Sequence, residues 1–211
     1  GSYKIQDEEK YVIKQFLSNI DKISVREKDT IEEIRNLTDK EIIEVLDPTF
    51  LVDKIKWDQL SISSLPKKKY ILVYQLGYNK NLIKIANKIA EQIHCSVIEV
   101  PATISLRYLF NKYKATSPIE FVNLIKNAEC IVTSSFHGTA FSIIFEKTFY
   151  TIALNQGTDN RSRNLLENLS LNNRMISLDS KVDFSHIDYD LVNEKLQKLK
   201  SISKSYLKSF L

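Results

Sequence analysis

The sequence is poor in the residues that specialised architectures need. Its 211 residues include 4 glycines, 4 prolines, 2 cysteines, 1 methionine and 1 tryptophan. So few glycines and prolines exclude a collagen-like or low-complexity chain and disfavour an all-β protein with many tight turns. Two cysteines do not make a disulfide framework. Because Cys95 and Cys130 both lie in apolar stretches, we expect buried thiols in strands and a reducing compartment.

Long apolar runs and a strong charge of one sign are missing as well. No stretch approaches the ~18 consecutive apolar residues of a membrane span. The chain has 30 basic and 26 acidic residues, for a net charge of +4. So small an excess argues against the basic stripe of a nucleic-acid-binding protein and fits an anionic small substrate or a modest surface patch. Hydrophobic residues make up 43% and charged residues 27%, which is typical of a folded globular chain.

Several motifs with well-understood chemistry are also missing. The sequence has no phosphate-binding loop of the P-loop type, no G-x-G-x-x-G and no G-x-S-x-G. His94 and His186 have no partner at the spacing of metal ligands. The sequence therefore predicts neither a metal site nor a serine hydrolase.

Strand and helix patterns alternate along the chain. Buried parallel strands are apolar on both faces, and such runs are bounded by helical periodicity here. We therefore predict an α/β fold, a Rossmann-like parallel sheet flanked by helices. A further strand–helix–strand pattern precedes it, and residues 53–68 are expected to be a loop or linker. The predicted strands are 22–25, 41–46, 70–76, 96–100, 130–134, 149–153 and 174–177, and the predicted helices are 7–19, 27–37, 79–93, 118–128, 138–146, 161–169 and 188–210.

The segment TSSFHGT, directly after the third of the later strands, is the strongest candidate site. In open parallel sheets, ligands bind beyond the carboxyl ends of the strands. Gly138 would let the backbone turn and a ligand approach, and the helix start favours an anion. Ser134, Ser135 and Thr139 add hydroxyl donors, and His137 adds a group that carries a proton near neutral pH. The alternative is that Ser135 caps the helix beside a satisfied polar histidine.

Two arginine positions are further candidates for binding an anion. Arg26 follows a short β-type run, and its guanidinium could bind a carboxylate or phosphate. The alternative is a surface salt bridge with Glu27 or Asp29. Arg161 and Arg163 lie at a predicted helix start, where cations oppose the helix dipole. An anionic ligand would explain them, and ordinary surface charge explains them equally well.

Four segments taken together resemble the polysaccharide pyruvyl transferase family. Their order and spacing fit over about residues 15–210, which correspond to the later half of a typical two-domain member of GT-B-like fold. The resemblance implies that residues 1–46 are the remnant of the N-terminal domain with the hinge. Residues 47–211 would then form the C-terminal Rossmann-like domain. The four segments are ISVRE (23–27), VLDPTFL (45–51) followed by Trp57, residues 117–145, and the G-x-x-N-R segment 157–161.

The resemblance also implies an activity. Family members transfer a pyruvyl group from phosphoenolpyruvate to a sugar of a bacterial surface polysaccharide, forming a ketal without a metal or other cofactor. His137 matches the proposed general acid, Arg26 matches an arginine that contacts the donor, and Asn160 and Arg161 match the binding segment. Many members carry Arg-Leu before this histidine. Here Ser135-Phe136 stands there and removes a cationic partner for the phosphate.

The expected partners are phosphoenolpyruvate and a glycan or lipid-linked saccharide acceptor, with no nucleic acid. The expected location is the cytoplasm, with the inner face of the membrane as a second expectation. Arg107, Tyr108 and Tyr113, in the connection 101–116, either contact the acceptor or belong to an ordinary amphipathic helix. Two other functions stay open. One is a GT-B glycosyltransferase with a nucleotide-sugar donor, and the other is a non-catalytic domain that only folds or docks a partner.

Overall fold

The computed structural model describes residues 4–60, 66, 68–101, 116–154, 157, 159–180 and 182–210. The chain divides into two units. The first is drawn from Gly1–Leu51, Gln156–Ser170 and Asp190–Leu211, and the second from Val52–Asn155 and Leu171–Tyr189. Each unit is described by itself below. The domain boundary expected between residues 46 and 47 stays a prediction.

The second unit contains the predicted parallel sheet. All neighbouring strands are parallel, and their order is β4-β3-β5-β6-β7. The first strand in sequence, β3, therefore lies between the second and the third. The direction in which strands are added reverses at β3 and β5, and ligands of open α/β sheets bind at such a reversal. The strands are β3 (Tyr70–Gln75), β4 (Ser96–Pro101), β5 (Cys130–Thr133), β6 (Thr148–Ile152) and β7 (Met175–Ile176).

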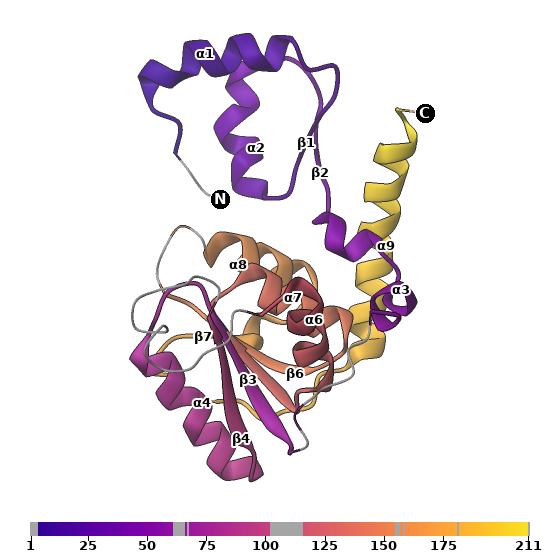
Figure 1. The fold of residues 1–211 in the computed structure, drawn as a ribbon. Coiled ribbons are helices and arrows are strands. Elements are labelled where there is room, and N and C mark those ends of the chain that lie inside the picture. The colour runs from indigo at the N-terminus through magenta and orange to yellow at the C-terminus, as the bar shows by residue number, and fades with distance from the viewer. Residues whose placement is uncertain are drawn as a thin grey trace. The chain divides into compact units, whose positions relative to one another are not determined.

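Helices cover both faces of this sheet, which confirms the α/β, Rossmann-like fold. Helix α4 (Lys80–Ile93) packs on one face, whereas α6 (Pro118–Asn127) and α7 (Phe136–Ile144) lie on the other (Figure 1). Part of the stretch expected to be a loop forms the short helix α3 (Lys54–Asp58), and η3 (Asn172–Arg174) precedes β7. Helix α7 begins two residues before the predicted start at Gly138.

Local signals in the sequence explain where two of these helices begin and end. Ser117 accepts a hydrogen bond from the Glu120 amide at 3.2 Å, and the Glu120 carboxylate accepts one from the Ser117 amide at 2.8 Å. With Pro118 in the first turn, this capping box fixes the start of α6. His94 ends α4 in the left-handed conformation, at a φ of 53°.

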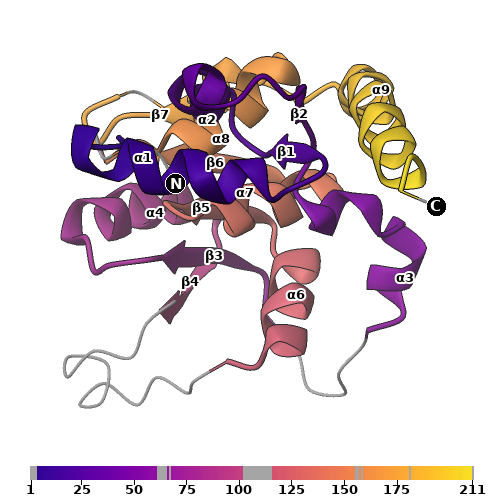
Figure 2. The ribbon, with the colours of Figure 1, turned by 90° about the horizontal axis from the view of Figure 1, so that it is seen from above.

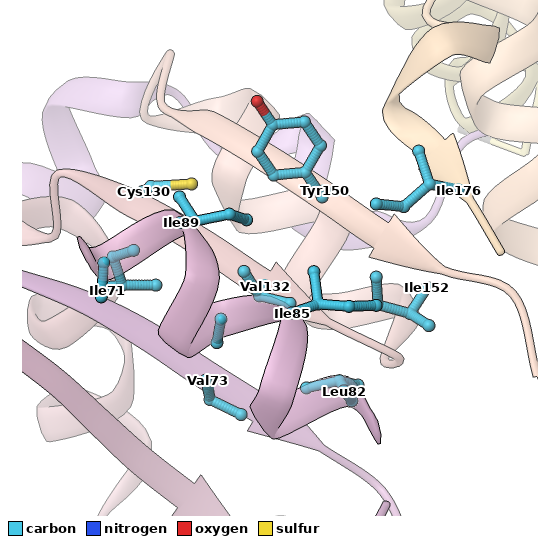
Figure 3. Close-up of a cluster of buried hydrophobic side chains, with 12 residues drawn as sticks. Ile71, Val73, Leu82, Ile85, Ile89, Cys130, Val132, Tyr150, Ile152 and Ile176 are labelled. Atoms are coloured by element: carbon cyan, nitrogen blue, oxygen red, sulfur yellow. The ribbon is translucent and has the colours of Figure 1, made fainter. Parts of the chain in front are cut away.

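The face of the sheet under α4 carries the main hydrophobic core. Alternate residues of β3, β5 and β6 point at α4, as the period of a strand requires. Cys130 is buried in this core, as expected, but Cys95 lies one residue before β4 and is only half-buried. The labelled apolar residues in Figure 3 are Ile71, Val73, Leu82, Ile85, Ile89, Val132, Ile152 and Ile176.

The first unit is built on a short β–α–β arrangement. Strands β1 and β2 run side by side and parallel, with Ile23 paired to Ile42 (Figure 1, Figure 2). Buried side chains of α1, β1, α2 and η1 form a small core of Leu17, Ile23, Ile34 and Leu37. Its elements are α1 (Asp7–Ser18), β1 (Ile23–Val25), α2 (Lys28–Ile34), η1 (Arg35–Leu37), β2 (Ile42–Glu44), η2 (Pro48–Leu51), α8 (Asp159–Asn168) and most of α9 (Tyr189–Lys208).

Candidate functional site

A hydrogen-bonded turn connects β5 to α7 at the carboxyl edge of the sheet. The Thr133 hydroxyl donates to the carbonyl oxygen of Tyr74 at 2.6 Å, and the Ser134 amide donates to the same oxygen at 3.3 Å. The Ser135 amide donates to the Thr133 hydroxyl at 3.0 Å. These bonds join the ends of β3 and β5, where strand order reverses, and they hold the turn in one conformation.

Two of the predicted binding residues in this turn face the interior of the unit. A Cβ atom at Gly138 would lie 2.2 Å from the Thr133 hydroxyl oxygen, so the glycine lets α7 pack directly on β5. Thr139 is fully buried; its hydroxyl donates to the Ser135 carbonyl at 3.2 Å and lies 2.7 Å from the Thr151 hydroxyl. Gly138 and Thr139 therefore fix the position of α7.

The two serines of the turn, Ser134 and Ser135, differ in the roles of their side chains. Ser135 is the N-cap residue of α7, which agrees with the alternative interpretation, but its buried side chain accepts no capping hydrogen bond. The Ser134 hydroxyl oxygen is also buried, and it has no hydrogen-bond partner within the described part of the chain. A buried hydroxyl without a partner is costly, and Ser134 is not among the described residues that line the nearby pocket.

His137, the second residue of α7, is exposed at the mouth of a pocket. Its ring makes an edge-to-face contact with Phe136, with ring centroids 5.5 Å apart. The pocket has a volume of about 240 Å³ and lies where β3, β4, α6 and α7 meet. The imidazole therefore opens onto a concave surface at the predicted edge of the sheet. The pocket is lined by Tyr74, Val100, Thr116, Pro118, Phe121, His137 and Phe141.

Sequence reasoning missed the aromatic wall of this pocket. The Tyr74 and Phe121 rings are half-buried and lie 4.4 Å apart, tilted by 47°. Burial raises the pKa of the Tyr74 hydroxyl, so it stays protonated at neutral pH. The Phe141 and Phe121 ring centroids lie 5.9 Å apart, and Trp57 makes an edge-to-face contact with Phe141, with ring centroids 5.0 Å apart. The alternation of β3, which puts Tyr74 on the face opposite to Val73, was the available signal.

Arg26 and Arg161 form an ion-pair network in the first unit. Arg26 pairs with Asp47 at 2.5 Å rather than with Glu27 or Asp29. Arg161 pairs with the same Asp47 oxygen at 3.3 Å, and its Nε lies 2.9 Å from the Glu27 carboxylate. The network joins three segments that are far apart in the sequence. Because it contains two guanidinium groups and two carboxylates, its formal charges balance.

Burial and neighbouring charges shift the pKa values in this network. Burial works to raise the pKa of Asp47, but hydrogen bonds from Thr49 and Arg26 outweigh it, and the pKa lies below its usual range. Burial, reinforced by the positive charge of Arg26, lowers the pKa of Arg161. The Arg26 side chain keeps 44% of its surface exposed, against 17% for Arg161. Arg26 is thus the more accessible cation of the pair.

The two remaining predicted residues of the first unit are Asn160, which is half-buried, and Arg163, which is exposed. The Asn160 amide donates to the Asp29 carboxylate at 2.7 Å. Arg163 is exposed on α8. The structure therefore brings Arg26, Arg161 and their carboxylate partners together, and it engages Asn160 with an acidic side chain of the same unit.

Three further observations concern what the site can hold. Arg107, Tyr108 and Tyr113 lie outside the described residues. Within the described ranges, no three His, Cys, Asp or Glu side chains come together as a metal ion would require. Among the described helices, none is both long enough and apolar enough to cross a membrane.

Three comparisons with known proteins were made. A family model described as polysaccharide pyruvyl transferase matches residues 1–156, which is more than half of the chain. Comparisons with curated proteins and with solved structures found no match.

Proposed function

This chain belongs to the polysaccharide pyruvyl transferase family, a family of transferases, and we propose that it transfers the pyruvyl group of phosphoenolpyruvate to a sugar of a bacterial surface polysaccharide, forming a cyclic ketal. The donor and acceptor belong to this proposal, as does its place in the cytoplasm, where phosphoenolpyruvate is made. A lipid-linked saccharide would be presented there at the inner face of the membrane.

The position of His137 is the observation that carries the proposal. The imidazole is exposed at the start of a nine-residue helix, beside a pocket at the reversal point of a parallel sheet. The positive end of the helix dipole favours an anion at the start of α7. Phosphoenolpyruvate carries a carboxylate and a phosphate, and we propose that these anionic groups lie at the start of α7, outside the pocket.

The proposed chemistry begins with proton transfer. Protonated His137 gives its proton to the methylene carbon of phosphoenolpyruvate, which becomes a methyl group and leaves the neighbouring carbon cationic. One sugar hydroxyl adds to that carbon and loses its proton. Phosphate then departs, and a second hydroxyl of the same sugar adds and loses its proton, which closes the ketal. One of the two released protons restores the imidazolium and the other leaves with phosphate. A positioned acid of this kind contributes about 10²–10⁴-fold in rate.

Arg26 is the second residue for which we propose a donor contact. Its guanidinium is held by Asp47 and still keeps 44% of its side-chain surface exposed. A guanidinium binds a carboxylate or phosphate through two parallel hydrogen bonds, which an ammonium group does not reproduce. Replacing Arg26 by Lys should therefore raise the KM for phosphoenolpyruvate more than it lowers kcat.

The experiment compares His137→Gln with wild type, using phosphoenolpyruvate labelled in the pyruvyl carbons. We expect labelled glycan and released phosphate from wild type, and a rate about 10²–10⁴-fold lower from the variant. His186→Gln is the matched control, because His186 is an exposed histidine of the same unit that does not line the pocket. Equal transfer by His137→Gln and wild type would remove the proposed acid.

Ligand protection separates this proposal from the glycosyltransferase alternative. A ligand that binds only the folded state raises its melting temperature. We expect phosphoenolpyruvate to raise it and a nucleotide sugar to leave it unchanged. The opposite pattern would favour the glycosyltransferase.

A further inference from the structure

The pocket beside His137 has a lining that does not suit the donor's anionic groups. Anionic ligands are held best by guanidinium and ammonium groups. Among the described residues of the lining, only the imidazole can carry positive charge near neutral pH. The rest of that lining is apolar, aromatic or hydroxyl-bearing. It therefore fits a neutral ligand better than a phosphate.

The aromatic rings of the pocket suit a ligand with an apolar face. Tyr74 and Phe121 are half-buried, and the 47° tilt between their rings gives the pocket a bent aromatic wall. A sugar ring has C–H groups on its faces and hydroxyls around its rim. Packing a face on aromatic rings takes the C–H groups out of water and leaves the hydroxyls free. The Tyr74 hydroxyl can donate and accept, so it can bond one of them.

The size of the pocket fits one such ring. Its volume of about 240 Å³ equals that of about eight liquid water molecules. That space is large enough for one sugar ring with its hydroxyls. The ring would be the terminal sugar of a longer glycan, with the remaining sugars outside the pocket.

We propose that this pocket is the subsite for the terminal sugar ring of the acceptor, with Tyr74 and Phe121 as its stacking wall. The sugar's hydroxyls then lie next to His137, where the carbon atom of the donor becomes cationic. The catalytic part of this inference rests on the proposed function, whereas the binding part does not.

The chain's single tryptophan provides the readout. Trp57 packs against Phe141 at 5.0 Å, and Phe141 lines the pocket, so an occupant changes the surroundings that Trp57 senses. Methyl β-glucoside, methyl β-galactoside and methyl β-mannoside are titrated in the absence of donor. We expect a saturable change in tryptophan emission with at least one of them.

Two variants test whether that signal comes from the pocket. Phe121→Leu should weaken binding about tenfold or more, because it removes an aromatic face. Tyr74→Phe keeps the ring and the fold, removes one hydroxyl and should weaken binding several-fold. Phe184→Leu is the control, because Phe184 is an aromatic residue of the same unit that is 49% exposed and does not line the pocket. It should bind as wild type does.

The outcomes separate this inference from the proposed function. If no glycoside changes the emission, if both pocket variants bind as wild type does, or if phosphoenolpyruvate competes with the glycoside, the sugar subsite is overturned. Intact glycoside binding without pyruvyl transfer would overturn the proposed function and leave the subsite standing. With transfer active, Tyr74→Phe should raise the KM for the acceptor and leave the KM for phosphoenolpyruvate unchanged.

Discussion

The two faces of the five-stranded sheet are built from the same strands and differ in chemistry. Under α4, side chains such as Ile71, Val73 and Val132 form an apolar core. On the opposite face, Tyr74 and Thr133 from two of these strands carry hydroxyl groups. Successive residues of a strand point to opposite faces. The residues that face α4 therefore contribute to the core, and the residues between them contribute to the site.

The hydroxyls of the second face bond mostly to other groups of the protein. Thr133 donates to the end of β3, and Thr139 shares a hydrogen bond with Thr151. Buried polar groups that are paired fix a particular geometry. Polar side chains thus replace some apolar side chains on this face, and their hydrogen bonds fix the turn that holds His137 at the pocket. The comparison predicts that substitutions on the α4 face lower only the stability of the protein. Substitutions on the opposite face should also change the rate of pyruvyl transfer.

Ile89→Ala should have the largest effect on stability. Ile89 is 1% exposed in the core under α4, and truncating such a residue costs about 2–5 kcal/mol of unfolding free energy. Chemical denaturation measures it. Below the melting transition, pyruvyl transfer should remain at the wild-type rate. Ile93→Ala, on the same helix but 37% exposed, should cost less than about 1 kcal/mol. Equal losses in the two variants would contradict this description of the core.

Gly138→Ala should destabilise by about 1–3 kcal/mol, because the new methyl group meets Thr133 and forces α7 off β5. Glycine to alanine within a helix ordinarily stabilises, so the sign of the change tests the contact. Transfer should also fall, since the displacement moves His137. Gly77→Ala should leave both quantities near wild type, because no described residue other than the two chain neighbours comes within 4 Å of the added carbon. A stabilised Gly138→Ala would show that α7 does not pack so closely.

Alkaline pH should lower the free energy of unfolding through one buried tyrosine on each face of the sheet. Burial raises the pKa of Tyr70 and of Tyr150 to about 12, from a usual value of 10. The folded state therefore holds each proton more tightly. The resulting stability is complete below pH about 10 and is lost as pH rises to about 12, on the order of 1 kcal/mol per tyrosine by pH 11. Denaturation at pH 9 and pH 11 measures it. Tyr70→Phe and Tyr150→Phe should each flatten this dependence, and an unchanged slope in both would contradict it.

Thr139→Val should have the smallest effect, about 0.5–1.5 kcal/mol, because it leaves the Thr151 hydroxyl without the partner it has at 2.7 Å. Adding Thr151→Val removes the orphaned group. The double variant should therefore lose less than the sum of the two single changes. Strict additivity in a double-mutant cycle would show that the two hydroxyls do not interact.

Much of the fold could be predicted because its signals are local. The apolar runs of β3, β5 and β6 and the Ser117–Pro118 helix start are readable in short windows of sequence. Two features could not be placed in this way. Helix α3 is a five-residue helix, too short for periodicity to identify. Helix α7 starts before Gly138, because the glycine serves a contact with Thr133 inside the helix rather than a turn ahead of it.

The candidate site could be predicted only where it follows from one strand end. His137 and Ser134 come directly after β5, so the rule for parallel sheets located them. Tyr74 also lies at a strand end, and the alternation of β3 gives its face. Its contact with Phe121 and its place beside His137 depend on the order of the strands and on the packing of α6, which no short stretch of sequence contains. The pairing of Arg26 with Asp47 spans 21 residues and is likewise a product of the folded chain.

The most direct test of the central claim, that His137 protonates the donor, is transfer from phosphoenolpyruvate in deuterium oxide. The methyl group of the ketal product is then examined by mass spectrometry and NMR. The account predicts one deuterium atom in that methyl group with wild type, and incorporation about 10²–10⁴-fold slower with His137→Gln. A methyl group formed without solvent deuterium, or incorporation at an equal rate in the variant, would contradict it.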